Sequence, residues 1–511
     1  MPAEFATGRA GQAEAAPAGP GSIWVHVSAD LGIVLGLALL GALVAGALWS
    51  WRHPFIGLGL IVAGMAFHSF LLMVLLRLGT PYTLVRLFQG WKEVLLAVVT
   101  LAALAGVWRD RREGRLGRPI LTDWLALAFA ALVAVYFLLP GSILHSGANL
   151  AQRAVGFRID ALIPLLYFLG RRTGATPGER ATAAWLCLGA GAAVAVFGLF
   201  ELWLVPTRAW LDWGVNLYTS FLGFTYKGPL GLPENFFITL ADGTLVRRMV
   251  STYISPLGIA YTGVLLFPLG AALIERRQAE GRARWVAGIV LGLLLAGVLF
   301  SVTRLALLVA VAEAGLLLLL LRRRWLAALV PVLAIGTIFM LYIYPSFGPA
   351  VDRQLVAGRS GHGQAAISAN DTSAQEHYGY LVLDLRFDLS HPLGQGTGAS
   401  TIRYGQLVGT GESAVLGIFG DLGLLGGLVY VALYLLVLWS ALAALRRPPL
   451  DPLRMALPLV ALVGGLALVP ITVTSDVWGD LSVTFLFWWA AGAAVTLAQR
   501  EKHPPAAGQV A

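Results

Sequence analysis

The chain has 511 residues, of which 58% are hydrophobic and 12% are charged, and its formal net charge is +9 at pH 7. Soluble domains contain about 25% charged residues, so the composition excludes an ordinary soluble protein and indicates a protein of the lipid bilayer. Cys187 is the single cysteine, which excludes a disulfide framework and a cysteine-based metal site. The basic residues are scattered through short connections, so nucleic acid is not an expected partner.

Apolar runs of about 20 residues, the length that crosses the hydrocarbon layer, recur along the chain. They predict an all-α, polytopic membrane protein with 12 or 13 transmembrane helices. Residues 1–30 are expected to form a flexible tail, residues 31–498 a single transmembrane domain, and residues 499–511 a cytoplasmic tail. The fifth run is short enough to be partly re-entrant. The predicted spans are residues 31–50, 55–76, 92–107, 121–140, 156–170, 181–204, 254–275, 285–302, 305–321, 325–344, 412–443, 453–473 and 479–498.

The arginine-rich connections predict which loops face the cytoplasm. When alternate loops are assigned to the cytoplasm, residues 109–118, 171–172 and 322–324 gather on one side. Positive charge in short loops marks the cytoplasmic side. The two long inserts, 205–253 and 345–411, then lie outside, the second of them between the tenth and eleventh spans.

Ionisable residues at membrane depth are costly and are functional candidates. Arg86 and Lys92 lie at the mouth of the third span, and Arg153 and Arg158 lead into the fifth, where Asp160 could pair with Arg158. Basic side chains that snorkel to the interface are the structural alternative for this group.

Three further arginines follow the first long insert. Arg247 and Arg248 open the motif R-R-M-V-S-T-Y-I-S-P-L-G, and Arg304 lies between two apolar runs with no acidic neighbour in sequence. Guanidinium donors beside a helix N-terminus favour phosphate oxyanions. An ordinary basic loop flank is the alternative for the adjacent pair.

The second long insert supplies candidate proton acceptors. His377 and Glu412 are imidazole and carboxylate groups of the kind that act as general bases, although Glu412 could also simply stabilise the start of a helix. His391 opens H-P-L-G-Q-G-T-G. Because this glycine run follows no predicted strand and carries no lysine, it is expected to be a tight turn, with His391 as one of its turn residues or as a substrate contact.

Taken in order, the motifs at 247–258, 303–308, 391–398 and 412–426 resemble the superfamily of bacterial O-antigen ligases and O-antigen or exopolysaccharide polymerases. The resemblance covers about residues 150–440. It implies a membrane glycosyltransferase that uses sugars linked to polyprenyl diphosphate on the extracytoplasmic face of the inner membrane. The ligase branch commonly has a histidine followed by Asn where this chain has Glu412 and Ser413, so the pattern looks more like the polymerase branch.

The sequence therefore predicts a metal-independent, inverting polysaccharide polymerase without a cofactor. The arginines would neutralise the leaving diphosphate, and neither outer insert contains a D-x-D pair. The expected partners are a polyprenyl-diphosphate-linked oligosaccharide, a glycan acceptor, membrane lipids and other polysaccharide assembly proteins. The alternatives are an O-antigen ligase acting on lipid A–core, a flippase or transporter of lipid-linked oligosaccharide, and a peptidoglycan polymerase of the shape-and-division type. The expected catalytic residues are Glu412, His377 and Arg304, and the expected diphosphate or substrate contacts are Arg247, Arg248, Arg158, Arg153, Lys92, Arg86 and His391.

Overall fold

A computed structural model of the chain describes residues 21–115, 117–223, 225–226, 228–239, 244–275, 281–350, 372–400, 412–446 and 451–500. His362 and Arg403 of the second long insert lie outside the described residues. The helices are α1 (Gly21–Arg52), α2 (Pro54–Met65), α3 (His68–Arg77), α4 (Tyr82–Gln89), α5 (Trp91–Arg112), α6 (Leu121–Leu138), α7 (Gly141–Leu144), α8 (Leu150–Arg172), α9 (Pro177–Leu204), α10 (Ala209–Asp212), α11 (Val215–Leu222), α12 (Pro256–Ile274), α13 (Gly281–Phe300), α14 (Arg304–Leu321), α15 (Arg324–Tyr342), α16 (Tyr344–Phe347), α17 (Thr372–Ser390), α18 (Ala414–Leu445), α19 (Pro452–Leu459), α20 (Gly465–Thr474) and α21 (Leu481–Arg500). Short elements are the strands β1 (Phe237–Thr239) and β2 (Leu245–Arg247), the 3-10 turns η1 (Pro229–Gly231), η2 (Glu234–Phe236), η3 (Ser251–Tyr253) and η7 (Val477–Gly479), and the π-helical turn η6 (Val460–Gly464).

The predicted all-α, multi-pass architecture is confirmed. Within the described ranges, 11 helices are long and apolar enough to cross a membrane, and the pair α2 and α3, bent by 56°, makes a twelfth candidate. The fifth predicted span corresponds to α8, a continuous helix of 23 residues. Its charged residues lower its hydropathy, and α8 is not among the 11 helices that are long and apolar enough to cross a membrane.

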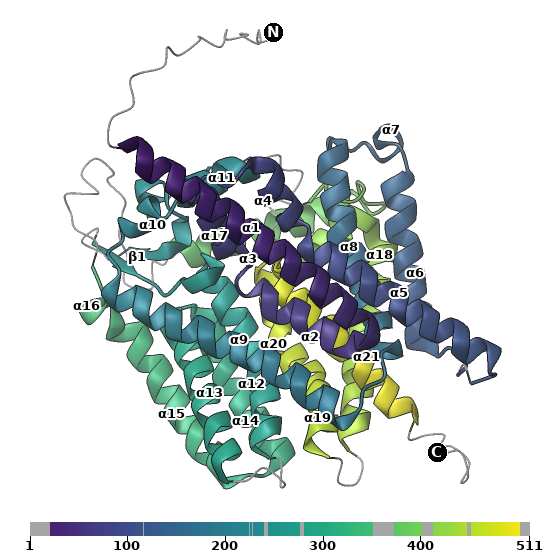
Figure 1. Ribbon diagram of the computed structural model, residues 1–511. Coiled ribbons are helices and arrows are strands. Elements are labelled where there is room, and N and C mark those ends of the chain that lie inside the picture. The colour runs from purple at the N-terminus through teal and green to yellow at the C-terminus, as the bar shows by residue number, and fades with distance from the viewer. Residues whose placement is uncertain are drawn as a thin grey trace.

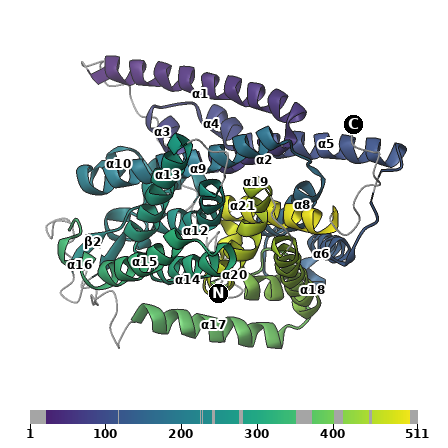
Figure 2. The same cartoon turned by 90° about the horizontal axis from the view of Figure 1, so that it is seen from below.

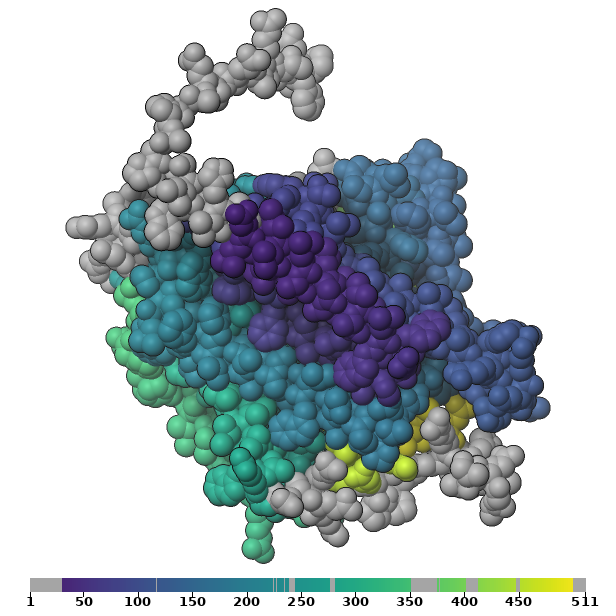
Figure 3. All heavy atoms as spheres, in the orientation of Figure 1, coloured from purple at the N-terminus to yellow at the C-terminus, as the bar shows by residue number. Residues whose placement is uncertain are grey.

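Helix α1 lies along the outside of the helical bundle (Figures 1 and 3). It begins at Gly21, inside the segment predicted as a tail. Its apolar side chains, among them Val34, Leu37 and Leu48, are exposed on the surface. A helix that is hydrophobic all round needs either a protein core or lipid, so this face of α1 is suited to contact with acyl chains.

The most deeply buried helices lie in the middle of the bundle. Figure 2 shows α20 and α21 between α1 on one side and α17 on the other. Helices α12 and α21 are buried over most of their length. In Figure 1, α4, α7 and α11 lie at one end of the bundle, which we call the upper end, and α19 lies toward the other, the lower end. The upper end corresponds to the predicted extracytoplasmic side.

Helices α8 and α21 meet through glycines that allow their backbones to approach closely. A Cβ added at Gly492 would lie 2.0 Å from the carbonyl oxygen of Tyr167, and one added at Gly170 would lie 2.2 Å from that of Trp489. Small residues commonly mediate helix packing in membranes, because lipid provides no hydrophobic driving force between helices. These two glycines therefore fix the separation of α8 and α21.

The two long inserts contact each other at the upper end. Strands β1 and β2 form an antiparallel ladder in which Phe237 is paired with Arg247. The backbone N–H of Arg247 donates to the carbonyl of Pro349 (2.9 Å), and Val246 forms a bridge with Ala350. The end of the first insert is thereby tied to the start of the second.

Substitution of Gly492 by valine should destabilise the protein. The valine Cβ would clash with the backbone of α8, which cannot move away far enough to relieve the contact. Overpacking of this kind is expected to cost about 1–3 kcal/mol of stability. The matched control is Gly106→Ala in α5, where an added Cβ meets no atom within 4 Å. Thermal unfolding in detergent should show a lower midpoint for Gly492→Val and an unchanged or higher one for the control. Equal midpoints for the two variants would contradict close α8–α21 packing.

Candidate functional site

Arg248 is held at the turn between α13 and α14. The residue after it, Met249, donates its backbone N–H to the carbonyl of Phe300 (3.0 Å). The Arg248 side chain donates from Nε to the carbonyl of Ser301 (2.8 Å) and from Nη2 to Thr303 Oγ1 (2.9 Å). Thr303 is the N-cap residue of α14 and precedes Arg304. The first insert therefore places one arginine beside another that is far from it in sequence.

The charges of Arg248 and Arg304 interact. Burial, and to a lesser extent the positive charge of Arg304, lower the pKa of Arg248 to about 10. Within the described part of the chain, the Arg248 side chain donates hydrogen bonds to three neutral oxygens, the third being the carbonyl of Asn235 (3.1 Å). At neutral pH Arg248 stays protonated, so this corner of the upper end is electropositive and suited to an anion.

Tyr261 links this electropositive corner to the second insert. The side chain projects from α12, its hydroxyl lies 3.2 Å from Ser475 Oγ, and it interacts electrostatically with both Arg248 and Glu412. The carbonyl of Ser475 accepts the backbone N–H of Ala414 (3.1 Å), the first residue of α18. Tyr261 is thus near the start of α18 through Ser475 and within electrostatic reach of Arg248.

His377 and Glu412 form a direct contact. Nδ1 of His377 on α17 lies 2.9 Å from Oε2 of Glu412. Glu412 directly precedes Ser413, whose hydroxyl caps α18 by accepting the N–H of Leu416 (3.1 Å). A carboxylate is favoured at a helix N-terminus by the helix dipole. Nδ1 is therefore the ring nitrogen of His377 that faces the carboxylate.

The glycine run between these elements is a tight turn, as predicted. Gly394, Gly396 and Gly398 all have positive φ (71°, 94° and 78°), a conformation that glycine adopts without strain. The carboxylate of Asp421 on α18 accepts the backbone N–H groups of Gly398 (2.5 Å) and Ser400 (2.8 Å). The turn is therefore fastened to α18 just after its first two turns.

His391 lies at the start of this turn, where it completes the end of α17. Its Nδ1 lies 3.0 Å from the carbonyl of Phe387 and 2.9 Å from Ser390 Oγ. The imidazole also stacks on the Phe387 ring, with centroids 4.4 Å apart. These contacts give His391 the turn role that was one of its two sequence interpretations.

Arg247 differs sharply from its neighbour Arg248. Its Nη2 lies 2.6 Å from Oε2 of Glu201 on α9, both side chains are buried, and it also donates to the carbonyl of Val205. Glu201 in turn accepts the backbone N–H groups of Val250 (2.9 Å) and Ser251 (3.2 Å). Arg247 thus anchors the first insert to α9, and we do not assign it to diphosphate binding.

The remaining predicted contacts lie in other groups. Lys92 and Arg158 each lie 3.4 Å from a carboxylate oxygen of Glu93. Arg153 caps the end of α6 by donating to the carbonyls of Phe137 and Leu139. Arg86 is exposed on α4. Of the predicted site residues, Arg248 and Arg304 therefore form one pair through their charges and His377 and Glu412 form another by direct contact, and Tyr261 interacts electrostatically with one member of each pair.

Asp160 does not pair with Arg158. Residues two apart on a helix point in different directions, and Asp160 instead faces the bundle interior. There it lines a small cavity of about 20 Å³ together with Asp421, Asp476 and the N-cap residue Ser413. The sequence interpretation overlooked this carboxylate cluster, as well as Tyr261 and Ser475. Tyr261 and Asp421 lie within predicted spans, whereas Ser475 and Asp476 lie in the short connection between the last two predicted spans, where polar residues are common.

Comparison of the chain with protein-family models and with curated proteins returns no match.

Removal of the Glu201 carboxylate should be strongly destabilising, because it leaves the buried Arg247 without its partner. Loss of one member of a buried ion pair typically costs about 3–5 kcal/mol. We expect Glu201→Ala to lower the thermal unfolding midpoint and the yield of folded protein. The double variant Glu201→Leu/Arg247→Met should recover much of the stability. A Glu201→Ala protein as stable as the wild type would contradict the anchoring role.

The docking of α17 on α18 should weaken as the pH rises from about 4 to about 7. Burial and the negative charges of Asp384 and Asp421 raise the pKa of Asp388 on α17 from 3.8 to about 7. The folded protein therefore holds this proton more tightly than the unfolded chain does. The stabilisation is fully present below the unfolded pKa and is lost as the pH rises through about 7. Thermal unfolding across this window should show a smaller pH dependence for Asp388→Asn, whereas Asp451→Asn, at an exposed position, should behave like the wild type.

Proposed function

We propose that this protein is a membrane glycosyltransferase that polymerises oligosaccharide units carried on polyprenyl diphosphate. The observation that supports the proposal is that Tyr261 interacts electrostatically with one member of an arginine pair, Arg248, and with one member of a histidine–carboxylate pair, Glu412. Arg248 and Arg304 supply positive charge, and His377 and Glu412 lie 2.9 Å apart. Transfer from a lipid diphosphate requires both kinds of group.

The arginine pair suits the leaving group. In the transfer step, the bond between the anomeric carbon and the diphosphate oxygen breaks, and the diphosphate leaves with the bonding electrons. Two fixed guanidinium groups stabilise charge that develops on those oxygens, and they are more effective away from bulk water. Arg248 is held by the Ser301 carbonyl and Thr303, so it needs no reorganisation when the charge appears.

The histidine–carboxylate pair suits the acceptor. The acceptor hydroxyl forms the new bond to the anomeric carbon and must lose its proton as it does so. If Nδ1 of His377 donates to Glu412, the carboxylate orients the ring and Nε2 takes the proton. If His377 is already protonated, Glu412 takes it instead. Attack from the face opposite the diphosphate gives inversion at the anomeric centre.

The membrane placement follows from the same proposal. The chain is a multi-pass membrane protein, and its candidate site lies among the two long inserts predicted to be extracytoplasmic. We place the protein in the bacterial inner membrane with the site facing outward, where a lipid-linked oligosaccharide would be available after translocation. In this proposal catalysis proceeds without ATP, because the bond to the diphosphate already supplies the driving force. It also proceeds without a metal ion or another cofactor, because the arginines neutralise the leaving diphosphate.

The test is a reaction with purified protein and a synthetic polyprenyl-diphosphate oligosaccharide in detergent. We expect polyprenyl diphosphate to be released, and a ladder of products separated by one repeat unit to appear in mass spectra. Arg248→Ala, Arg304→Ala, His377→Ala and Glu412→Gln should each lower the rate by about a hundredfold or more. The control is Arg208→Ala, which removes an exposed arginine of the first insert.

The products distinguish the alternatives. A single addition to lipid A–core, without a ladder, would identify a ligase working with the same site. Movement of the lipid-linked donor across a vesicle membrane without bond formation would identify a flippase and refute the transferase proposal. Full activity of both Arg304→Ala and Glu412→Gln, with normal folding, would refute the assigned site.

A further inference from the structure

The lower end of the bundle contains a second cavity, far from the arginine pair in the fold. It has a volume of about 90 Å³ and lies among the ends of α8, α9, α19 and α21, with α2 and α12 behind them. Its lining includes the apolar residues Phe55, Ala184, Leu269, Leu457 and Trp489. The cavity is partly open to the outside of the bundle, so a ligand can enter it.

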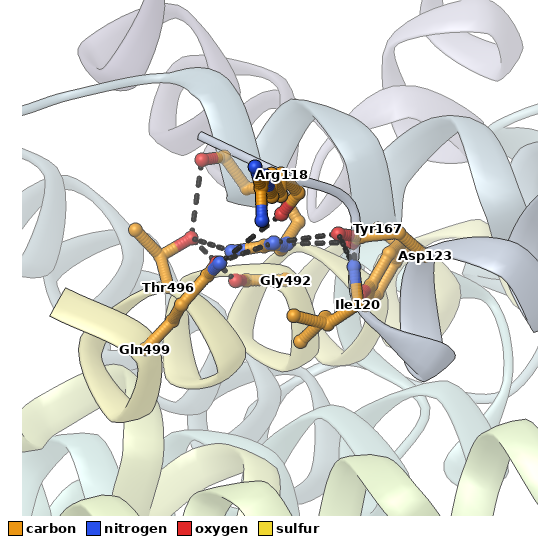
Figure 4. Close-up of polar contacts among 8 residues, drawn as sticks. Arg118, Ile120, Asp123, Tyr167, Gly492, Thr496 and Gln499 are labelled. Atoms are coloured by element: carbon orange, nitrogen blue, oxygen red, sulfur yellow. Dashed lines mark hydrogen bonds and ion pairs between the residues drawn. The ribbon is translucent and has the colours of Figure 1, made fainter. Parts of the chain in front are cut away.

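One wall of this cavity is a rigid polar cluster. Arg171 at the end of α8 donates from Nε and Nη2 to the two carboxylate oxygens of Asp123 (2.8 and 2.7 Å), and Tyr167 donates to the same carboxylate (2.8 Å). Figure 4 shows Asp123 and Tyr167 on one side of this cluster and Thr496 and Gln499 of α21 on the other. Because Arg171 is paired with Asp123, it adds little net charge to the cavity and serves mainly to hold α6, α8 and α21 together.

Two further arginines line the cavity. Arg180 in the first turns of α9 and Arg454 in α19 both contribute to the lining, and no acidic residue is among the lining residues that the structure describes. Arg454 is exposed and Arg180 is partly buried. A cavity with cationic groups at its rim and aromatic and aliphatic groups in its interior matches an amphiphile with an anionic head.

We propose that this cavity binds an anionic phospholipid of the surrounding leaflet. The phosphodiester would lie near Arg180 and Arg454, and the glycerol and the first methylenes would contact Phe55, Leu457 and Trp489. Basic pockets between transmembrane helices on the cytoplasmic side are typical sites for anionic headgroups. The lower end is the predicted cytoplasmic side, so charge and location agree. The proposal does not depend on the transferase activity.

The test uses the full-length protein purified in a neutral detergent. It is titrated separately with phosphatidylglycerol, phosphatidylcholine and inorganic phosphate, with bound lipid counted by native mass spectrometry and stability followed by thermal unfolding. We expect phosphatidylglycerol to remain bound and to raise the unfolding midpoint, whereas phosphatidylcholine and inorganic phosphate should have little effect.

Matched variants locate the binding. Arg180→Gln/Arg454→Gln should weaken phosphatidylglycerol binding about 30-fold, since each arginine near an anionic lipid contributes roughly a factor of five. Arg282→Gln/Arg284→Gln removes the same charge from the exposed start of α13 and should leave binding unchanged. Gly174→Trp adds a bulky, uncharged side chain at a lining residue and should also weaken phosphatidylglycerol binding. An added Cβ at this position meets no atom within 4 Å, so the substitution should not disturb the backbone.

Three outcomes would overturn the proposal. Equal binding of phosphatidylcholine and phosphatidylglycerol would show that the cavity accepts any lipid. Stabilisation by inorganic phosphate alone would indicate a site for a soluble anion. Equal losses in the pocket variant and in the α13 variant would mean that general surface charge, and not this cavity, attracts the lipid.

Discussion

A charged side chain that is buried in the bilayer has no water to hydrogen-bond with, so it must find a partner within the protein. This constraint accounts for how the charged residues of the chain are arranged. An unpaired polar group in hydrocarbon costs several kcal/mol. Arg171 is accordingly bonded to Asp123 on both carboxylate oxygens, and Arg247 is bonded to Glu201. Each pair joins a helix to another part of the chain, so pairing also determines which segments lie together.

The Arg247–Glu201 pair has a particular consequence for the candidate site. Glu201 accepts two backbone N–H groups beyond β2 as well as the Arg247 side chain. The segment after β2 is thereby held on α9, and Arg248, the next residue, is directed to the α13–α14 turn instead. A structural arginine and a candidate functional arginine are adjacent in sequence because one positions the other. The electropositive corner depends on the buried pair even though the pair does not belong to it.

The sequence predicted the fold well and the site only in part. Span positions follow from hydropathy, which is a local property, and α9, α12, α14 and α21 begin and end within a few residues of their predicted limits. Pairing is not local. Arg247 and Arg248 are indistinguishable in sequence, because the acid that pairs with Arg247 comes from another span, 46 residues away. Glu201 was itself a signal, since an acidic residue near the end of an apolar span needs a partner.

Asp160 illustrates the opposite error, in which closeness in sequence suggested a pair that helix geometry prevents. Arg158 turns to Glu93 of α5, whereas Asp160 turns inward to Asp421 and Asp476. Tyr261 was overlooked for a related reason. It follows Pro256 in an apolar span and resembles a core aromatic residue. Its hydroxyl can be recognised as part of the candidate site only in the folded protein, where Ser475 connects it to the start of α18. The local sequence pattern thus determines the helices, whereas the candidate site is formed by segments that are distant in sequence. The pairing of buried charges contributes to which of these segments come together.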